Sequence, residues 1–214
     1  MATMMTTEQV IVRKVGRPRA FQDEDVYRAM ARVIGEVGYT GLTFSLIAVQ
    51  IGCTTSALIR RFGDKRALVQ GFISWLERQQ KERFAGGKAA IASPLEALKA
   101  RWFIGNAASS STDIDPTNPE SYLAFFIEAR CEPAYRPHLA RLNKDFEAGA
   151  AAILEEAHAA SEITECDYGR VAHSLNCAMT GAISLWMDNP AQPLAEELNS
   201  VFDAVVAPYR TSPS

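Results

Sequence analysis

The sequence predicts an all-α protein in which a small helix-turn-helix unit precedes a larger helical region. Apolar residues recur three and four positions apart along most of the chain, and no segment alternates as a half-buried strand does. Gly, Pro and helix-capping residues punctuate these segments. With 214 residues, 48% of them hydrophobic, the chain can bury a sizeable core. We expect a basic arm over residues 1–20, a helix-turn-helix unit over 21–68 and a helical domain over 69–214.

Charge is distributed unevenly along the chain. Residues 1–70 carry ten Lys and Arg against six Asp and Glu, whereas residues 71–214 carry twelve against nineteen. A basic N-terminal third fits a nucleic-acid-binding segment, although an excess of this size is also common on solvated surfaces. Residues 1–12 do not resemble a signal peptide, and no run of eighteen apolar residues occurs. We therefore expect a cytoplasmic protein without membrane contact, whose four cysteines are reduced thiols.

A basic arm precedes the first predicted helix. The run R-K-V-G-R-P-R over residues 13–19 has no acidic residue, and its G-R-P-R part resembles the core of an AT-hook, an extended minor-groove ligand. Pro18 stiffens the chain and biases Arg17 toward extended geometry. Arginine side chains are attracted to narrow A·T-rich grooves. A solvated tail is the alternative, but the position of the arm favours DNA contacts at Arg17 and Arg19.

The first helix is predicted over residues 23–37. Six apolar residues form one stripe along it, and Gly38 is suited to ending the helix. The stripe should pack against the two helices that follow, completing a three-helix unit. Its residues are Val26, Ala29, Met30, Val33, Ile34 and Val37.

Two short helices joined by a tight turn are predicted over residues 43–62. Thr43 and Thr54 are candidate N-caps, and Gly52 can take the left-handed conformation that closes a helix. In the second helix Leu58 and Phe62 are four apart and point inward. Such a helix fits the major groove of DNA and exposes its N-terminal residues to base edges. The residues expected on or beside its outward face are Ser56, Ala57, Ile59, Arg60 and Arg61.

Residues 36–68 resemble the DNA-binding domain of TetR-type transcriptional regulators. The matching positions are Gly38, Gly41, Leu42, Thr43, Ile47, Ala48, Gly52, Leu58, Phe62, Asp64, Lys65 and Leu68. The resemblance implies binding to double-stranded operator DNA, with Lys65 on the phosphate backbone. The family usually has Tyr where this chain has Ile59, which could instead pack on a thymine methyl. The expected DNA contacts are Arg17, Arg19, Thr43, Ser45, Thr54, Thr55, Ser56, Ala57, Ile59, Arg60, Arg61 and Lys65.

Further helices are predicted from start and stop signals in the remainder. A Ser, Asp or Asn followed by Pro or Glu marks several helix starts. Helix starts are predicted at Asp64, with a helix to about Phe84, at Ser93-Pro94 and at Asn118-Pro119. A turn between Pro133 and Pro137 precedes a long helix, and a capping box over residues 164–167 begins a helix to about Asp188. A connection at Asn189-Pro190 and Gln192-Pro193 precedes the last helix.

The last two predicted helices suggest a dimer surface. The penultimate one carries small residues and is apolar round much of its circumference, so it must be covered on more than one face. An internal core is the alternative explanation. The TetR-type resemblance implies a homodimer formed by the two C-terminal helices as a four-helix bundle. The expected interface residues are Ala178, Ala182, Leu185, Leu198, Val201 and Val205.

Aromatic residues cluster in the helical remainder, and most of them are expected in the core. The resemblance places an effector pocket in this domain. A hydrophobic or amphipathic small molecule would bind there among apolar groups and a few polar ones. The expected pocket residues are Trp75, Trp102, Phe103, Phe126, Arg130, Phe146, His173 and Asn176.

Other functional classes are also compatible with a helical chain. It could be a ligand-binding or metal-binding protein, an enzyme, or an interaction bundle whose N-terminal domain does not bind DNA specifically. The chain lacks G-x-S-x-G, H-E-x-x-H and C-x-x-C motifs. His173 and Cys177 share a helix face and could hold zinc with Cys166, although such pairs arise easily by chance.

The sequence favours a one-component transcriptional regulator, more specifically a repressor. We expect an N-terminal helix-turn-helix that reads a palindromic operator as a dimer, and a C-terminal domain that senses a small molecule. We expect no catalytic residue, no metal and no cofactor.

Overall fold

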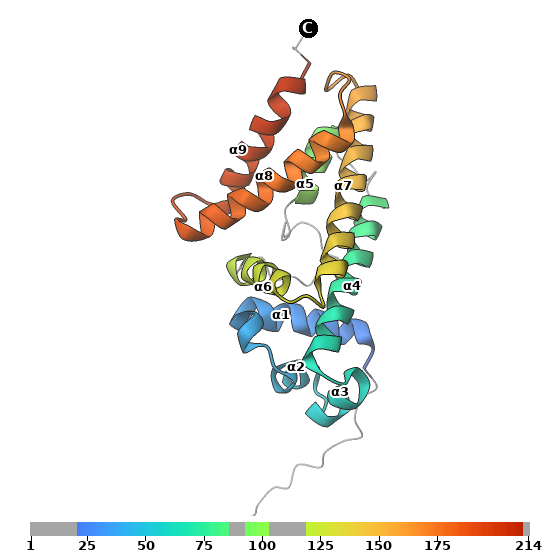
Figure 1. Cartoon of the computed structure of the whole chain (residues 1–214), viewed down its shortest axis with the longest axis vertical. Helices are drawn as coiled ribbons and strands as arrows, with labels where there is room; N and C mark the ends of the chain where they lie inside the picture. The colour runs from blue at the N-terminus through green and yellow to red at the C-terminus, as the bar shows by residue number, and fades with distance from the viewer. Residues whose placement is uncertain (1–20, 86–92, 103–118, 212–214) are drawn as a thin grey trace, which may run out of the picture.

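The computed structural model describes residues 21–85, 93–102 and 119–211, which form nine α-helices, one short 3-10 helix and no β-strand (Figure 1). The all-α prediction is therefore confirmed. The predicted positions Arg17, Arg19, Phe103 and Asn118 lie outside the described residues, as does the side chain of Trp102. The elements are α1 (Asp23–Gly41), α2 (Phe44–Ile51), α3 (Thr55–Phe62), α4 (Lys65–Ala85), α5 (Pro94–Trp102), α6 (Pro119–Cys131), α7 (Arg136–Ala159), α8 (Tyr168–Asp188), α9 (Leu194–Val206) and η1 (Ala207–Tyr209).

The first helix begins where the sequence predicts and is interrupted at Gly38. The backbone N–H of Gln22 donates to Asp25 Oδ2 at 2.9 Å, as part of a capping box. Gly38 has φ 68° and ψ −177°, a conformation that residues with side chains rarely adopt. The helical run predicted to end at Val37 therefore stops there, and one further turn continues to Gly41.

Local capping defines the two helices of the helix-turn-helix. Oγ1 of Thr43 accepts a hydrogen bond from the N–H of Leu46 at 3.3 Å, and Oγ1 of Thr54 accepts one from Ala57 at 3.2 Å. Between them Gly52 adopts the left-handed conformation, with φ 69° and ψ 33°. The three predicted capping roles are confirmed.

The helices α4 and α5 also start as predicted. Oδ1 of Asp64 accepts a hydrogen bond from the N–H of Ala67 at 2.8 Å. Oγ of Ser93 accepts one from Glu96 at 3.2 Å. In each case a side chain just before the helix satisfies a backbone N–H that has no partner within the helix.

The start of α8 differs from the prediction. Its cap is Asp167, whose Oδ1 accepts from the N–H of Arg170 at 2.9 Å. The predicted capping box beginning at Thr164 is wrong, because the N–H and Oγ1 of Thr164 donate to the carbonyl of Tyr209 at 2.7 and 3.3 Å. Thr164 thus ties the connection between α7 and α8 to the C-terminal segment.

The described residues form two separate hydrophobic cores. The first joins α1, α2 and α3 to α4, α6 and the start of α7, whereas the second is built from α5, α7, α8 and α9. Phe72 and Trp75 of α4 and Phe125 of α6 all belong to the first core. Figure 1 shows α6 directly above α1, and the two helices are in contact. The first core therefore extends beyond the helix-turn-helix into the helical remainder.

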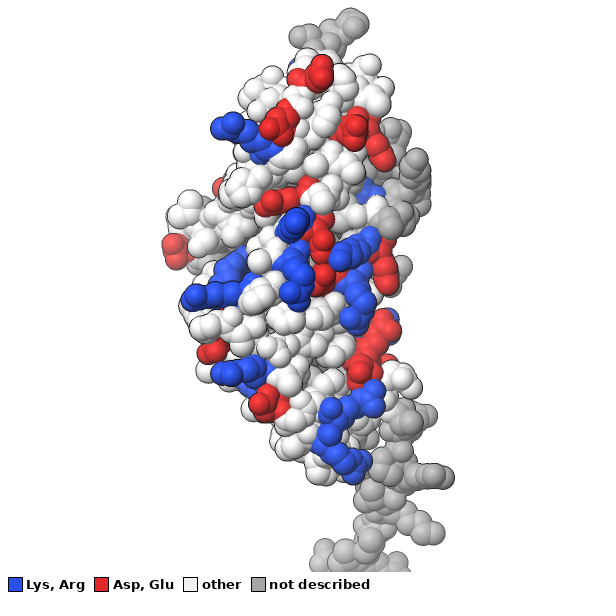
Figure 2. Space-filling model, turned by 45° about the vertical axis from the view of Figure 1, so that its right-hand side comes forward, with Lys and Arg blue, Asp and Glu red and all other residues white. Residues whose placement is uncertain are grey.

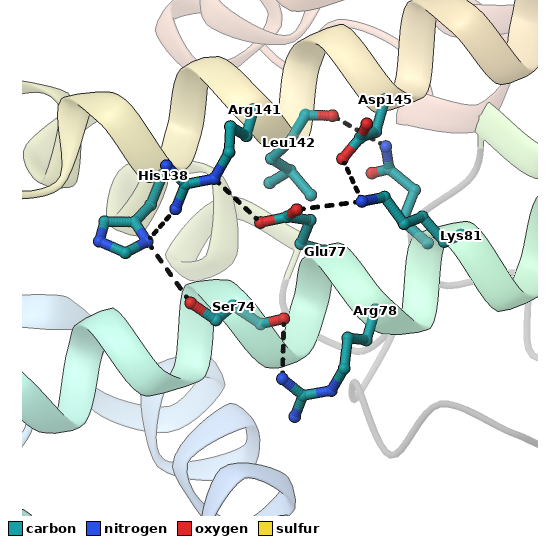
Figure 3. A network of polar contacts seen from close by, with 9 residues as sticks. Ser74, Glu77, Arg78, Lys81, His138, Arg141, Leu142 and Asp145 are labelled. Carbon is teal, nitrogen blue, oxygen red and sulfur yellow. Dashed lines mark hydrogen bonds and ion pairs between the residues drawn. The ribbon is translucent and has the colours of Figure 1, made fainter.

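A polar seam joins α4 to α7 (Figure 3). Glu77 of α4 forms ion pairs with Lys81 at 3.2 Å and with Arg141 of α7 at 3.7 Å. Lys81 also pairs with Asp145 at 3.0 Å. The partly buried seam comprises Ser74, Glu77, Gln80 and Lys81 of α4 with His138, Arg141, Leu142 and Asp145 of α7.

Contacts between side chains of α4 and the backbone of α7 accompany these ion pairs. Gln80 Nε2 donates to the carbonyl of Leu142 at 2.9 Å. Further along, a Cβ on Gly149 would lie 2.6 Å from the ring of Phe84. That ring packs edge-on against Phe146, with centroids 5.4 Å apart. The absence of a side chain at Gly149 is what lets the C-terminal end of α4 approach α7 so closely.

Candidate nucleic-acid interface

The second helix of the motif, α3, turns a polar and basic face to solvent. Leu58 is fully buried and Phe62 packs half-buried on the first core, which leaves the opposite side of the helix exposed. Ile59 on that side is 47% exposed. The residues of α3 and its cap that are exposed or half-buried, and that the sequence predicted as DNA contacts, are Thr54, Thr55, Ser56, Ala57, Ile59, Arg60 and Arg61.

Hydroxyl groups link the two helices of the motif. Ser45 Oγ at the start of α2 lies 3.4 Å from Thr55 Oγ1 of α3. Thr54 Oγ1 lies 3.1 Å from Ser56 Oγ. Thr43 and Ser45 are both exposed. Because a hydroxyl can both donate and accept, these groups retain hydrogen-bonding capacity for another partner. The structure thus gathers the predicted polar contacts at one end of the molecule.

The two arginines of α3 have different surroundings. Arg60 is exposed. Arg61 forms an ion pair with Asp23 of α1, and the hydrogen bond and charge of that carboxylate raise the pKa of its guanidinium. Figure 2 shows basic side chains at the lower end of the molecule, where α3 lies, and a mixed band of basic and acidic side chains at mid-height. Arg60 is therefore better placed for an external anion than Arg61.

Lys65, the first residue of α4, is engaged within the protein. Its Nζ donates to the carbonyl of Tyr39 at 2.7 Å and lies 4.4 Å from the centroid of the Tyr39 ring. Burial lowers the pKa of Lys65, an effect opposed by the charge of Glu128. The ammonium group has three N–H donors, so a phosphate contact would use those that Tyr39 leaves.

Two apolar residues of α2 that the sequence did not predict as site residues are exposed. Val49 is 80% exposed and Leu46 is 39% exposed. They lie three positions apart and so share a helix face. The available signal was that both fall outside the stripe of Ile47, Ala48 and Ile51 that packs inward.

The last turn of α1 connects the motif to α6 and α7. The hydroxyls of Tyr39 and Tyr135 lie 3.3 Å apart, and Thr40 Oγ1 donates to Glu128 Oε2 at 3.3 Å. The rings of Tyr39 and Phe125 meet edge-on with centroids 5.8 Å apart. Burial, together with the hydrogen bond to Tyr39, raises the pKa of Tyr135. These partners are 88 and 96 positions apart in the chain, so no local pattern predicts them.

The aromatic residues predicted for the pocket are divided between the two cores. Trp75 is buried in the first core, where it stacks on Phe72 at 5.7 Å and lies 6.1 Å from the ring of Tyr27 in α1. Phe126 packs at the edge of the first core and Phe146 at the edge of the second. Trp75 therefore contacts the helix-turn-helix unit itself.

The polar residues predicted for the pocket are also separated. Nδ1 of His173 and Nδ2 of Asn176, both on α8, lie 2.9 Å from Oε1 of Glu147 on α7. Arg130 is exposed near the end of α6, and its carbonyl accepts a hydrogen bond from Arg136 Nε at 3.2 Å. Glu147 was not among the predicted site residues, because nothing in its local sequence links it to α8.

The predicted dimer residues fall into two sets. Ala182 and Leu198 are 8% and 3% exposed and pack in the second core of their own protomer, which leaves little of their surface for a partner. Leu185 is 72% exposed. The remaining predicted residues, Ala178, Val201 and Val205, are half-buried.

Two further properties concern only the described residues. Within residues 21–85, 93–102 and 119–211, no three His, Cys, Asp or Glu side chains group so as to hold a metal ion, and Cys166 does not join the pair of His173 and Cys177. None of the helices in the same ranges combines the length and apolar composition needed to cross a bilayer.

Comparison with known proteins gives a match in sequence and several in structure. Residues 26–71 match the family described as bacterial regulatory proteins, tetR family. No curated protein matches the chain. A TetR-family transcriptional regulator from Agrobacterium tumefaciens superposes with a TM-score of 0.67 at 16% identity, over 88% of this chain and 97% of that one.

Two other solved structures are similar in the same way. A TetR transcription regulator from Haloarcula marismortui gives a TM-score of 0.65 at 18% identity, over 86% of this chain and 94% of that one. SmeT, the repressor of the Stenotrophomonas maltophilia multidrug efflux pump SmeDEF, gives 0.58 at 16% identity, over 90% and 92%. At these identities the likeness shows a shared fold.

Proposed function

We propose that this chain, whose residues 26–71 match the family of bacterial regulatory proteins, tetR family, is a homodimeric transcriptional repressor released from a palindromic operator by a small molecule. The observation that carries the proposal is the exposed face of α3, where Ser56, Ile59 and Arg60 stand on the opposite side from buried Leu58. A repressor of this kind acts in the cytoplasm, where the DNA is.

In this proposal α3 lies in the major groove and reads base edges through its N-terminal half. The hydroxyls of Thr54, Thr55 and Ser56 offer both donors and acceptors there. Ile59 supplies an apolar contact suited to a thymine methyl. Arg60 neutralises a phosphate, and Lys65 uses its remaining donors on the backbone.

The basic arm adds a second, minor-groove contact. Arg17 and Arg19 flank Pro18, so this part of the sequence offers two guanidinium groups. A narrow A·T-rich groove has an enhanced negative potential that favours arginine. We expect the arm to prefer operators whose flanks are A·T-rich.

Dimerisation would use the outer surface of α8 and α9. Leu185 supports this, because a large apolar side chain that is 72% exposed in one protomer is well suited to burial against another. Ala178, Val201 and Val205 have surface left to contribute. Ala182 and Leu198 would shape the surface from beneath.

An effector would bind in the helical remainder and bias one of two conformations, because a ligand with equal affinity for both shifts nothing. The contacts of Tyr39 with Tyr135 and of Thr40 with Glu128 give a physical route from α6 and α7 to the motif. The repressor SmeT, which has a similar fold, supports negative regulation. A coupling of about 3 kcal/mol would weaken operator binding about 150-fold.

The test is a genome-wide selection of DNA fragments bound by the full chain, followed by affinity measurements on the enriched sequence. We expect a palindrome whose half-site centres are one helical turn, about 35 Å, or a multiple apart. Log affinity should fall with log salt by about 0.9 for each phosphate contact. A scrambled duplex of equal composition is the control. Equal affinity for the enriched and scrambled duplexes would refute operator recognition.

A further inference from the structure

The helices α7 and α8 align a thiol, an imidazole and a carboxylate. Cys177 Sγ lies 3.6 Å from Nε2 of His173, and Nδ1 of the same ring lies 2.9 Å from Oε1 of Glu147. His173 and Cys177 are four positions apart on α8 and therefore share a face. Nδ2 of Asn176 also donates to Oε1 of Glu147, at 2.9 Å. The Cys177 thiol, the His173 imidazole and the Glu147 carboxylate are therefore arranged in space as a nucleophile, a base and a group that orients the base.

Glu147 determines which nitrogen of His173 carries the proton. Burial alone would raise the pKa of Glu147, but the hydrogen bonds from Asn176 and His173 outweigh it, and the pKa is lowered. An ionised carboxylate can only accept hydrogen bonds, so Nδ1 of His173 must be the N–H donor. In the neutral ring Nε2 then carries the lone pair, and it faces the thiol of Cys177.

We propose that Cys177 is an activated nucleophile and the modification site of this protein for soft electrophiles of the α,β-unsaturated carbonyl class. The Cys177 S–H proton moves to Nε2 of His173, and a sulfur lone pair forms the S–C bond to the β-carbon. The π electrons of the C=C bond move toward the α-carbon. That carbon then takes the proton back from His173, so the addition needs no oxidant, reductant or leaving group.

The other described cysteines lack this arrangement. Cys131 is also exposed, but its Sγ contacts the carbonyl of Ile127 in its own helix, at 3.7 Å. Cys53 and Cys166 are half-buried, and burial raises the pKa of both thiols. Raised thiol pKa values disfavour the thiolate, which is the reactive form. Cys131 therefore serves as an exposed reference within the same molecule.

The site shares α8 with Leu185, the exposed apolar residue of the proposed dimer surface. Cys177 and Leu185 are eight positions apart, and at about 100° per residue they are separated by about 80° around α8. The contact of His173 with Glu147 places the site on the side facing α7. The proposal makes no use of DNA binding and stands or falls separately from the proposed function.

The experiment measures the rate at which N-ethylmaleimide modifies each cysteine of the full-length chain at pH 7, by peptide mass spectrometry. An ordinary thiol is only a few per cent thiolate at this pH, so activation can raise the rate by up to about thirtyfold. We expect Cys177 to react about tenfold faster than Cys131. Equal rates, or a slower Cys177, would overturn the proposal.

Variants of the base and its partner provide the matched comparison. His173→Gln should slow modification of Cys177 about tenfold and leave the rate of Cys131 unchanged. Glu147→Gln keeps an acceptor for Nδ1 but removes its charge, so its effect should be intermediate. His173 is 64% exposed at its side chain, so its replacement should spare the fold, as circular dichroism would verify. An unchanged Cys177 rate in His173→Gln, or labelling of Cys177 that requires prior chelation of metal, would refute the nucleophile assignment.

Discussion

The ammonium group of Lys65 makes a contact within the protein and, in our proposal, also binds the DNA backbone. Its bond to the Tyr39 carbonyl ties the start of α4 to the last turn of α1, just after the interruption at Gly38. Arg60, by contrast, lies on the exposed face of α3. The two cations therefore allow structural and electrostatic contributions to DNA binding to be separated.

We predict that Arg60→Ala and Lys65→Ala each reduce the salt dependence of operator binding by about 0.9 in log–log slope. Lys65→Ala should in addition lower the free energy of unfolding by about 1 kcal/mol, because it removes a charge-assisted hydrogen bond. Affinity titrations at several salt concentrations and urea denaturation measure the two effects. A normal slope in Lys65→Ala would mean that Lys65 serves the fold alone.

At the scale of elements, α4 belongs to both halves of the molecule. Its N-terminal half packs Phe72 and Trp75 against Tyr27 of α1. Its C-terminal half meets α7 through the polar seam and through the contact of Phe84 with Gly149. Trp75 was predicted to line the effector pocket, whereas its ring packs against Tyr27 and Phe72 in the core that supports the DNA-binding unit.

Trp75→Ala should destabilise the protein by about 4 kcal/mol, because it leaves a large cavity beneath α1. Operator affinity should fall along with stability, even without effector. Trp75→Phe keeps an aromatic ring against Tyr27 and Phe72 and should lose less than half as much. Denaturation and operator titrations of both variants give the result. If Trp75→Ala kept normal stability and DNA binding and altered only the effector response, Trp75 would instead be a residue of the effector pocket.

At the scale of the whole molecule, the proposed function needs two copies of the chain. Each half-site of a palindrome is read by one protomer, so the affinity for the full operator depends on the interface. The buried positions Ala182 and Leu198 are poor test sites, because changing them would disturb the protomer core. Leu185 is exposed enough to be changed without that disturbance.

Leu185→Asp should convert the dimer to folded monomers and weaken binding to the full palindrome at least tenfold. Thr180→Asp is the matched control, since Thr180 is exposed on the same helix but about 140° away from Leu185. Analytical ultracentrifugation gives the oligomeric state, and circular dichroism the fold. A tight dimer in Leu185→Asp would place the interface elsewhere.

The residues that sequence reasoning placed well act through their near neighbours. Thr43, Gly52 and Thr54 cap helices by bonds or backbone conformations that span only a few positions, so local pattern specifies them. Thr164 was misassigned because its partner, Tyr209, lies 45 positions away and overrides the local capping signal. Glu147 was missed for the same reason.

In the candidate DNA interface, too, some features are set by the local sequence and others by contacts between distant residues. The sequence identified the exposed residues of α3, since helix periodicity sets which side faces the core. It could not reveal that Arg61 pairs with Asp23, because that contact is set by how α3 packs on α1. Ion pairs with residues of other helices therefore determine which basic side chains of α3 are available to bind DNA phosphates.

The seam between α4 and α7 lies off the centre of α4, so a pivot at the seam would move the two ends of the helix by different amounts. The seam is centred between Ser74 and Lys81, and at about 1.5 Å per residue Lys65 lies about 19 Å from that centre and Ala85 about 11 Å. If α4 pivots about the seam as a rigid rod, the displacement of Lys65 at the DNA-binding end should be more than one and a half times the displacement of Ala85 at the other end. Spin labels at the two ends of α4 would report that ratio, and equal displacements would indicate sliding without a pivot. With such a pivot, a small displacement near Ala85 would become a larger one at the DNA-binding end of α4.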